Sequence, residues 1–380
     1  MPNYSGKWKL PTVMQAEGAG NWPKPPFASG ELWMWGRNHQ GQLGQNNTTD
    51  YSSPVQVGAL TDWLQAAGSQ YHGSLAIKLD GTAWSWGDGA GGQLGQGSTT
   101  DYSSPVQIGA LTDWSKSMSG GVYGPNGAIK TDGTLWVWGT GGMGQLGQGN
   151  TTSYSSPVQV GALTNWLQFA AGYYCSTAVK TDGTLWTWGS GNSGRTGQNS
   201  TTNTSSPVQV GALTNWLQAS SGYKFSGAVK TDGTVWMWGV NDHGQLGQEN
   251  TTTYSSPVQV GALTDWSGIS CGNGFTLALK TDGTLWGWGE NTYGQVGDNS
   301  TTNRSSPVQV GVLTTWSRFD AGGHHSGGLT TDKKLYGWGW NNWGQLGVGD
   351  TTNRSTPTQV GALTTWERLL VTDGFMGGIK

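Results

Sequence analysis

Short runs of apolar and polar residues recur along the chain, and no segment keeps the 3.6-residue apolar period of an amphipathic helix. In one copy, residues 176–189 read STAVK-TDG-TLWTWG, which is two short runs around Asp-Gly. This pattern predicts a β-hairpin, because both turn residues accept positive φ. The runs PVQV, with Pro at the start where no ladder donor is needed, and WLQFAAG add two strands. Each copy therefore predicts four strands.

Three markers recur at a period of about 50 residues, which is typical of one repeat architecture. They are aromatic-x-Trp-Gly, Ser-(Ser/Thr)-Pro-x-Gln and a Thr-x-Trp that ends each copy. Each occurs seven times, and the first lies at Trp33–Gly36, Trp84–Gly87, Trp136–Gly139, Trp186–Gly189, Trp236–Gly239, Trp286–Gly289 and Tyr336–Gly339. Seven copies of four strands predict an all-β, seven-bladed β-propeller of four-stranded antiparallel blades. The alternative is a β-solenoid, whose coils are usually shorter.

The two ends of the repeat region complement each other. The chain ends in MGGIK, which matches TAVK in other copies but lacks the TLWxWG strand that normally follows. That strand is present near the N-terminus as ASGELWMWG, residues 28–36. We therefore expect the N-terminal strand to pair with the C-terminal blade and close the ring, which removes exposed sheet edges. The predicted propeller covers residues 29–380, and residues 1–28 form a leader or anchoring segment.

Composition supports a packed ring. There are 66 glycines and 24 tryptophans, only 11% charged residues, and a formal net charge of −3. The aromatic content excludes disorder, and the charge argues against a nucleic-acid partner. We expect the small residues of AAG, SSG and SCG to line the innermost strands and the Trp-x-Trp pairs to fill the space between blades. Cys175 and Cys271 lie at different repeat positions, so we expect no disulfide.

No segment predicts membrane insertion. The N-terminal residues contain no continuous apolar core of a secretory signal, and no window approaches the length of a membrane span. We therefore expect a soluble protein.

The combined motif LWxWGxNxxGQLGxGxTTxxSSPVQVG resembles the repeats of the regulator of chromosome condensation family. The resemblance covers nearly the whole chain and implies a seven-bladed propeller. It also implies a choice of functions, because the founding member exchanges nucleotide on the GTPase Ran and docks on nucleosomes, while other members are scaffolds or ligase parts. This chain lacks a basic N-terminal tail and a long insertion between blades. Its leader, YSGKWKLPTVMQAEGAGNWP, resembles leaders of structural proteins of marine tailed phages.

The candidates for chemistry favour structural explanations. His324 and His325 are adjacent, which is a poor arrangement for holding one metal ion, and a structural role for His325 is favoured. The long connection after each Trp-Gly is nearly invariant, so its polar side chains are expected to satisfy backbone groups. The recurring aspartates are interpreted as Asx-type turn residues: Asp80, Asp132, Asp182, Asp232, Asp282 and Asp332. The sequence predicts no catalytic residues, no cofactor and no metal.

The copies differ in two stretches, one after each Trp-Gly and one after each inner strand, where the variable residues include 70–72 and 122–126. Both sets are rich in aromatic residues and Asn, and each set is expected to gather around one rim of the ring, although Phe225 and Phe275 are interpreted as core. Aromatic and Arg side chains are typical interface anchors. The candidate binding face consists of Arg37, His39, Tyr173, Tyr174, Tyr223, Lys224, Tyr293, His324, Trp340 and Trp343.

These observations predict a non-enzymatic structural or interaction module. The leader favours a virion-associated phage protein, in the tail, a fibre or the capsid decoration, that binds a virion protein, a host surface component or a surface glycan through its loop face. The alternative is a nucleotide-exchange or chromatin-binding regulator of the chromosome condensation regulator type. A hydrolase or lyase that uses the central channel is a third hypothesis, for which the sequence offers no catalytic cluster.

Overall fold

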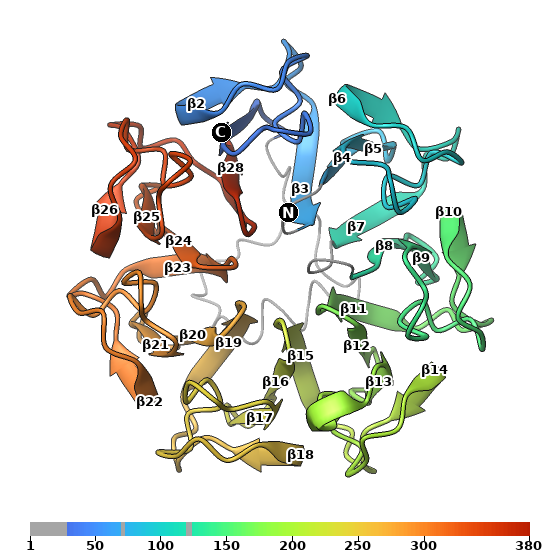
Figure 1. The fold of residues 1–380 in the computed structure, drawn as a ribbon, viewed down its shortest axis with the longest axis vertical. Coiled ribbons are helices and arrows are strands. Elements are labelled where there is room, and N and C mark those ends of the chain that lie inside the picture. Colours follow the sequence, from blue (N-terminus) through green and yellow to red (C-terminus); the bar gives the residue numbers. More distant parts are fainter. Residues whose placement is uncertain (1–28, 70–72, 119–123) are drawn as a thin grey trace, which may run out of the picture.

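The computed structural model describes residues 29–69, 73–118 and 124–380. Their strands form seven four-stranded antiparallel sheets arranged around a central axis like the blades of a propeller (Figure 1). The predicted fold class and blade count are confirmed. The leader, residues 1–28, and the variable residues 70–72 and 122–123 lie outside the described residues, so the expectations placed on them remain predictions.

Blades are numbered here from the first complete one. Blades 1 and 2 contain β3 (Trp63–Ser69), β4 (Gly73–Lys78), β5 (Ala83–Gly87), β6 (Tyr102–Gln107), β7 (Trp114–Met118), β8 (Asn126–Lys130), β9 (Leu135–Gly139) and β10 (Tyr154–Gln159). Blades 3 and 4 contain β11 (Trp166–Ala171), β12 (Cys175–Lys180), β13 (Leu185–Gly189), the short 3-10 helix η1 (Asn192–Gly194), β14 (Thr204–Gln209), β15 (Trp216–Ser221), β16 (Phe225–Lys230), β17 (Val235–Gly239) and β18 (Tyr254–Gln259).

Blades 5 and 6 contain β19 (Trp266–Cys271), β20 (Phe275–Lys280), β21 (Leu285–Gly289), β22 (Arg304–Gln309), β23 (Trp316–Ala321), β24 (His325–Thr330), β25 (Leu335–Gly339) and β26 (Arg354–Gln359). Blade 7 combines both ends of the described chain: β27 (Arg368–Val371), β28 (Phe375–Ile379), β1 (Leu32–Gly36) and β2 (Tyr51–Gln56).

Blade 7 closes the ring. Its strand order is β2-β1-β28-β27, and β1 pairs with β28 from Leu32↔Ile379 to Gly36↔Phe375. An isolated bridge between Gly30 and Trp63 links the same segment to blade 1. The closure predicted from the sequence is confirmed. With it, each of the seven described sheets has four strands.

The Asp-Gly hairpins form as predicted. In blade 3, Gly183 has φ +76° and connects β12 to β13. The Asp182 carboxylate accepts hydrogen bonds from the Thr184 amide (3.0 Å) and hydroxyl (2.6 Å). The same pair of bonds recurs at Asp80, Asp132, Asp232 and Asp282. These aspartates therefore act as Asx-turn residues.

The outer strand differs from the prediction at its proline. β14 begins three residues earlier, so Pro207 lies inside the strand and not at its start. The register between β13 and β14 shifts between Thr187↔Val208 and Gly189↔Thr204, so the proline occupies an irregularity in the ladder. A proline is tolerated there because an edge strand with a bulge needs no continuous row of amide donors.

The second tryptophan of each Trp-x-Trp packs between blades. Trp188 is fully buried among residues of blades 2 and 3, and its indole nitrogen donates to the Gln145 carbonyl of blade 2 at 2.9 Å. The equivalent bond forms at Trp86, Trp138, Trp238, Trp288 and Trp338. The first tryptophan behaves differently: Trp186 is half-buried and packs against the edge of this core cluster. The expectation that both rings fill the space between blades is thus confirmed only for the second.

A buried lysine covers the first tryptophan of a pair. The Lys180 ammonium lies 4.8 Å from the Trp166 ring and 3.7 Å from the Trp186 ring, which is a cation–π arrangement. Burial lowers the pKa of Lys180, while the nearby Asp182 partly opposes this shift. In blade 5, Lys280 also forms an ion pair with Asp265 at 3.3 Å. The recurring lysines therefore contact aromatic rings within six of the blades, whereas blade 6 has Thr330 at this position.

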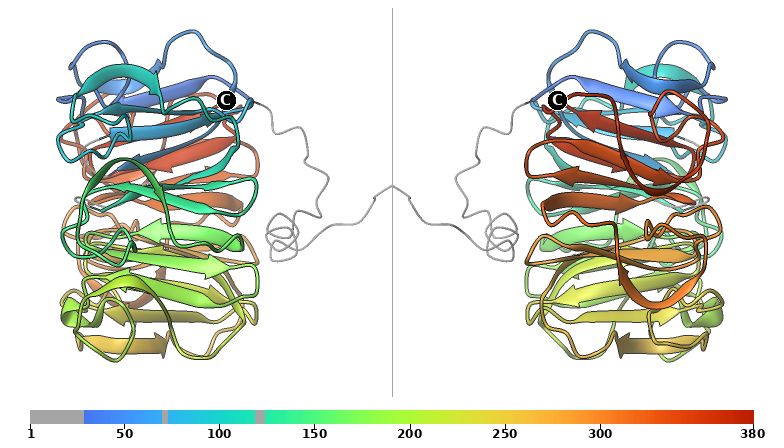
Figure 2. Two further views of the ribbon diagram at one scale, coloured as in Figure 1. Left: turned by 90° about the vertical axis from the view of Figure 1, so that its right-hand side faces the viewer. Right: turned by 90° about the vertical axis from the view of Figure 1, so that its left-hand side faces the viewer.

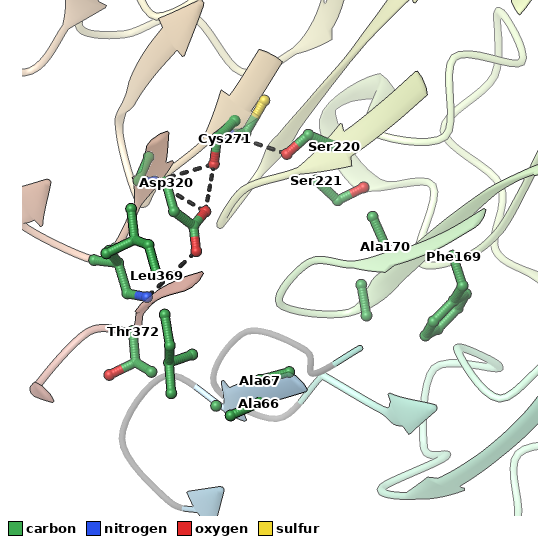
Figure 3. Close-up of a pocket in the computed structure, with 17 residues that line it drawn as sticks. Ala66, Ala67, Phe169, Ala170, Ser220, Ser221, Cys271, Asp320, Leu369 and Thr372 are labelled. Atoms are coloured by element: carbon green, nitrogen blue, oxygen red, sulfur yellow. Dashed lines mark hydrogen bonds between the residues drawn. The ribbon is translucent and has the colours of Figure 1, made fainter. Parts of the chain in front are cut away.

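The innermost strands face the central axis and carry small residues there, as predicted (Figures 1 and 3). Blade 7 departs from this pattern with the larger Leu370 and Val371 of β27, and blade 6 with the charged Asp320 of β23, where other copies have Ala170, Ser220 and Ser270. The Asp320 carboxylate accepts hydrogen bonds from the Ser270 hydroxyl at 2.7 Å and from the Val371 amide at 3.4 Å (Figure 3). Burial raises the pKa of Asp320 to about 6, although these hydrogen bonds oppose the shift. Asp320 thus links three neighbouring blades at the axis.

Both cysteines, Cys175 and Cys271, are buried and not joined in a disulfide, as expected. Within the described part of the chain, no helix is long and apolar enough to cross a membrane.

Candidate binding rim

The ring has two unlike faces, seen edge-on in Figure 2. The turn face carries the Asp-Gly turns and the Gly-Ala-Leu loops that lead into each inner strand. The opposite face, called the rim below, consists of the loop after each inner strand and the stretch that follows each Trp-Gly. Both variable sets reach the same face because the start of the second strand pairs with the end of the third, as in Cys175↔Gly189. The expectation that each set gathers around one rim is confirmed for the described residues.

The long connection after each Trp-Gly is held by its own polar side chains. In blade 4, Asn241 donates from its amide nitrogen to the Asn250 carbonyl at 2.9 Å and accepts from the Leu246 amide at 2.9 Å. The Glu249 amide then donates to the Ser305 carbonyl of blade 5 at 2.7 Å. An equivalent backbone bond joins each of the seven connections to the next blade. The structural interpretation of these loops is confirmed.

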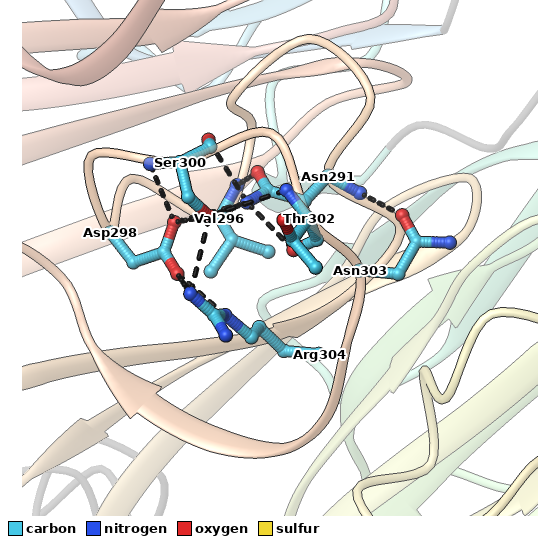
Figure 4. Close-up of polar contacts among 7 residues, drawn as sticks. All are labelled: Asn291, Val296, Asp298, Ser300, Thr302, Asn303 and Arg304. Carbon is cyan, nitrogen blue, oxygen red and sulfur yellow. Dashed lines mark hydrogen bonds and ion pairs between the residues drawn. The ribbon is translucent and has the colours of Figure 1, made fainter.

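The connection after Trp-Gly is stabilised by different side-chain contacts in different blades. In blade 4, the Asn250 side chain donates to the Tyr254 hydroxyl at 3.3 Å. In blade 5, Asp298 forms an ion pair with Arg304 at 2.6 Å and accepts from the Ser300 hydroxyl at 2.8 Å (Figure 4). Burial alone would raise the pKa of Asp298, but hydrogen bonds from Ser300, Arg304 and Asn291 outweigh it and hold this pKa below its ordinary value.

The first group of candidate residues forms a chain of ring contacts across blades 5, 6 and 7. The Arg37 guanidinium lies 5.0 Å from the Trp343 ring, and Trp343 contacts Trp340 at 4.5 Å between ring centroids. Trp340 in turn lies 5.9 Å from Tyr293 and 6.0 Å from His324. His39 is exposed beside Trp343, at 6.3 Å, and its imidazole lies 3.2 Å from the Asp50 carboxylate.

The second group lies on blades 3 and 4. Tyr173 contacts Tyr174 at 4.1 Å and Tyr223 at 4.3 Å between ring centroids. The exposed Lys224 places its ammonium 5.0 Å from the Tyr223 ring. Burial and hydrogen bonding with Tyr174 and Tyr223 raise the pKa of Tyr173, so its hydroxyl stays protonated and able to donate.

A hollow of about 440 Å³ joins the two groups. Tyr173, Tyr223 and Lys224 line one side of it, and His324 lines the other. All ten predicted residues therefore belong to one continuous band on the rim. Four further residues of the hollow were not among the predicted candidates: Asp242, His243, Asn273 and Glu290. Their position in the variable stretches was the available signal.

The remaining candidates are structural. His325 is fully buried, and burial, together with the neighbouring His324, lowers its pKa to about 3, so it is neutral near pH 7. Phe225 and Phe275 are fully buried in the core, as predicted. Among residues 29–69, 73–118 and 124–380, no group of three or more His, Cys, Asp or Glu is placed to hold a metal ion.

Comparison with known families identifies the ring. A model described as the RCC1-like domain matches residues 156–373, which is more than half of the chain. The chain belongs to the RCC1-like domain family. A second model, the regulator of chromosome condensation (RCC1) repeat, matches residues 29–76, 80–123 and 132–179. The family resemblance inferred from the repeat motif is confirmed.

Curated relatives share part of the chain. The mitochondrial RCC1 domain-containing protein RUG3 of Arabidopsis thaliana is 36% identical over 138 residues, which cover 36% of this chain and 31% of that protein. The E3 ubiquitin-protein ligase HERC2 of Homo sapiens is 33% identical over 141 residues, which cover 36% of this chain and 3% of HERC2. The matched part thus spans less than a third of either relative.

Solved structures share the whole fold. The crystal structure of Prp20p from Saccharomyces cerevisiae has a TM-score of 0.81 at 21% identity and covers 92% of this chain and 91% of that chain. Human WBSCR16 has a TM-score of 0.81 at 20% identity and covers 92% of this chain and 98% of that chain. At these identities the likeness shows the fold alone.

Proposed function

We propose that this protein is a non-enzymatic interaction module that binds a partner protein through the rim. The observation that carries the proposal is the continuous band of variable residues from Arg37 to Tyr174. Packing fixes most repeated positions, whereas the band combines half-buried aromatic rings with one arginine, Arg37, and one lysine, Lys224. Such residues are the usual anchors of protein interfaces. Membership of the RCC1-like domain family, whose structural neighbours bind proteins, supports the same function.

The partners described for the structural neighbours are properties of those proteins. The Prp20p structure was described together with binding to Gsp1p and histones, and yeast RCC1 was solved bound to Kap60. Nucleotide exchange or chromatin binding is the alternative for this chain, and its formal net charge of −3 gives that alternative no support.

Virion association is a finer hypothesis. It rests on the leader, residues 1–28, which lies outside the described residues, and the relatives named above come from plants, animals and yeast. A glycan ligand for the rim likewise remains a hypothesis, since aromatic rings also suit sugar binding. Mass spectrometry of purified phage particles carrying the gene would test the virion hypothesis, and absence of the protein would contradict it.

The rim proposal is tested with matched substitutions on the two faces. Proteins retained by the immobilised chain from its native source are identified, purified and titrated against Trp343→Ser and Tyr223→Ser on the rim. Leu213→Ser on the turn face is the control, because Leu213 is 48% exposed and apolar. We expect the rim variants to weaken the dissociation constant at least tenfold, on the scale of an interface anchor, and the control to leave it unchanged. A partner that is lost only with the turn-face variant contradicts the proposal.

A further inference from the structure

The hollow on the rim is built by four blades. Tyr173 comes from blade 3, Tyr223 and Lys224 from blade 4, Glu290 from blade 5 and His324 from blade 6. Since these residues are placed by separate sheets packed in a ring, their relative positions are fixed by the scaffold and not by one mobile loop. A ligand group that enters the hollow therefore meets a preformed set of side chains.

Glu290 is the unusual member of this set. Its side chain is only 18% exposed, yet no residue of the described part of the chain donates a hydrogen bond to its carboxylate, and the His324 imidazole nitrogen lies 4.0 Å away. The Glu290 carboxylate lies close to the backbone of Gly274, where an added Cβ would be only 2.7 Å from the carboxylate oxygen. Asp298, an acid whose side chain is 7% exposed, instead receives hydrogen bonds from Ser300, Arg304 and Asn291. Glu290 thus has unused capacity to accept hydrogen bonds from a group that enters the hollow.

The other groups around the hollow favour a cation. Two acidic residues, Glu290 and Asp242, line the hollow together with one lysine, Lys224, whose ammonium already lies over the Tyr223 ring. The rings of Tyr173 and Tyr223 lie 4.3 Å apart and form an aromatic wall. A carboxylate beside aromatic rings matches a planar guanidinium, which stacks on rings and donates two parallel hydrogen bonds to one carboxylate.

We propose that the hollow receives an arginine side chain of the partner protein, with Glu290 as the carboxylate that pairs with the guanidinium and Tyr173 and Tyr223 as the stacking wall. This inference rests on the proposed function of the rim. It assigns to the hollow a specificity for one positively charged residue, and to the aromatic chain around Trp343 the remaining contact area.

The test uses the full chain and the peptide acetyl-Gly-Gly-Arg-Gly-Gly-amide, with a citrulline peptide as the neutral control of the same shape. Saturation-transfer NMR measures which peptide protons contact the protein and yields dissociation constants by titration. We expect saturation of the arginine methylene protons and binding that is at least about tenfold tighter than that of the citrulline peptide, because the charged pair is lost in citrulline. Equal binding of the two peptides, or no saturation of the arginine side chain, overturns the proposal.

Two variants test whether arginine binding takes place in the hollow. Glu290→Gln is expected to reduce arginine binding to the level of the citrulline peptide, while Glu249→Gln, which removes the same charge from an exposed position elsewhere on the rim, is expected to leave it unchanged. Both variants are first checked for an unchanged melting temperature. Unchanged binding by Glu290→Gln overturns the arginine assignment. If Trp343→Ser still abolishes binding of the natural partner in that case, the rim function stands and only the arginine site falls.

Discussion

The turn face and the rim are built by the same seven repeats and differ in what the repeats hold constant. On the turn face, one set of contacts recurs in blades 1 to 5: an Asp-Gly turn, a lysine over two tryptophans and an exposed leucine, as at Leu213 and Leu263. On the rim, the backbone recurs but the side chains change, from Tyr173 in blade 3 to His324 in blade 6. The face with the varied residues is the one that can distinguish a partner.

The difference also separates stability from recognition. Repeated residues contact their own blade or the next one, so their loss is expected to weaken the ring. Residues of the rim band contact one another above the ring, so their loss is expected to weaken binding and leave folding nearly intact. The following changes test that division, beginning with the largest effect.

Removal of β1 should destroy the ring. A chain that begins at Arg37 lacks the strand that joins β28 to β2, together with the buried side chains of Leu32, Met34 and Trp35. We expect no cooperative thermal transition and a loss of native β-sheet signal in circular dichroism. A chain that begins at Ser29 is the matched control because it retains β1. An Arg37 chain that melts like the control would show that closure does not hold the ring.

The two tryptophans of one pair should differ. Trp188→Ala removes a fully buried ring and its bond to Gln145, and we expect a loss of about 3–5 kcal/mol in the free energy of unfolding. Trp186→Ala removes a half-buried ring, so we expect roughly half that loss or less. Urea unfolding of both variants measures the difference. Equal losses would contradict the distinction between Trp188, which packs between blades, and Trp186, which is covered by Lys180.

Two turn-face glycines test how closely the blades approach. Gly183 has φ +76°, and a Cβ there would lie 2.2 Å from the Thr214 carbonyl oxygen, whereas Gly161 has φ +59° and no atom within 4 Å of its Cβ position. Gly183→Ala therefore adds a backbone clash to the strain of positive φ, and we expect losses of about 3 kcal/mol for Gly183→Ala and about 1 kcal/mol for Gly161→Ala. Thermal unfolding of the two variants distinguishes them, and a larger loss at Gly161 would rule out this explanation.

The ion pair between Asp298 and Arg304 in blade 5 refines the comparison between the two faces. It lies on the rim side but has a structural role. Arg304→Met removes the partner of Asp298, and we expect a loss of about 1–2 kcal/mol at pH 7 with no effect on binding through the rim. Since the pKa of Asp298 is held below its ordinary value, this contribution is present above about pH 4 and is lost as the pH falls through the folded-state pKa. Chemical unfolding at pH 7 and pH 3 measures both effects, and an equal loss at the two pH values would contradict the ionic origin.

Much of this architecture could be predicted from the sequence because each signal is local and repeated. Asp182-Gly183 predicts its turn, and the repeat of Trp186–Gly189 counts the blades. The missing partner of the last strand predicts the closure. The gathering of Arg37 and Tyr174 on one face also follows once the strands alternate in direction, because both loops must emerge at the same end of the blade.

Other features depend on contacts between segments that the sequence leaves unpaired. The place of the Lys180 ammonium between Trp166 and Trp186 follows from the geometry of three strands, and no spacing indicates it. Pro207 lies at an irregularity of the ladder that its local sequence does not reveal. Glu290 stands out because no donor among the residues that the structure describes reaches it, which is a property of its surroundings and not of its repeat position.

The central claim is that the rim binds the partner protein, whereas the turn face stabilises the ring. Hydrogen–deuterium exchange of the free chain and of its complex with a purified partner tests it most directly, because one measurement reports on both faces at once. We predict protection of residues 37–40, 172–174, 222–224, 290–293 and 340–343 in the complex, with unchanged exchange in the Asp-Gly turns and Gly-Ala-Leu loops. Protection confined to those turns and loops would contradict the assignment of the rim as the binding face.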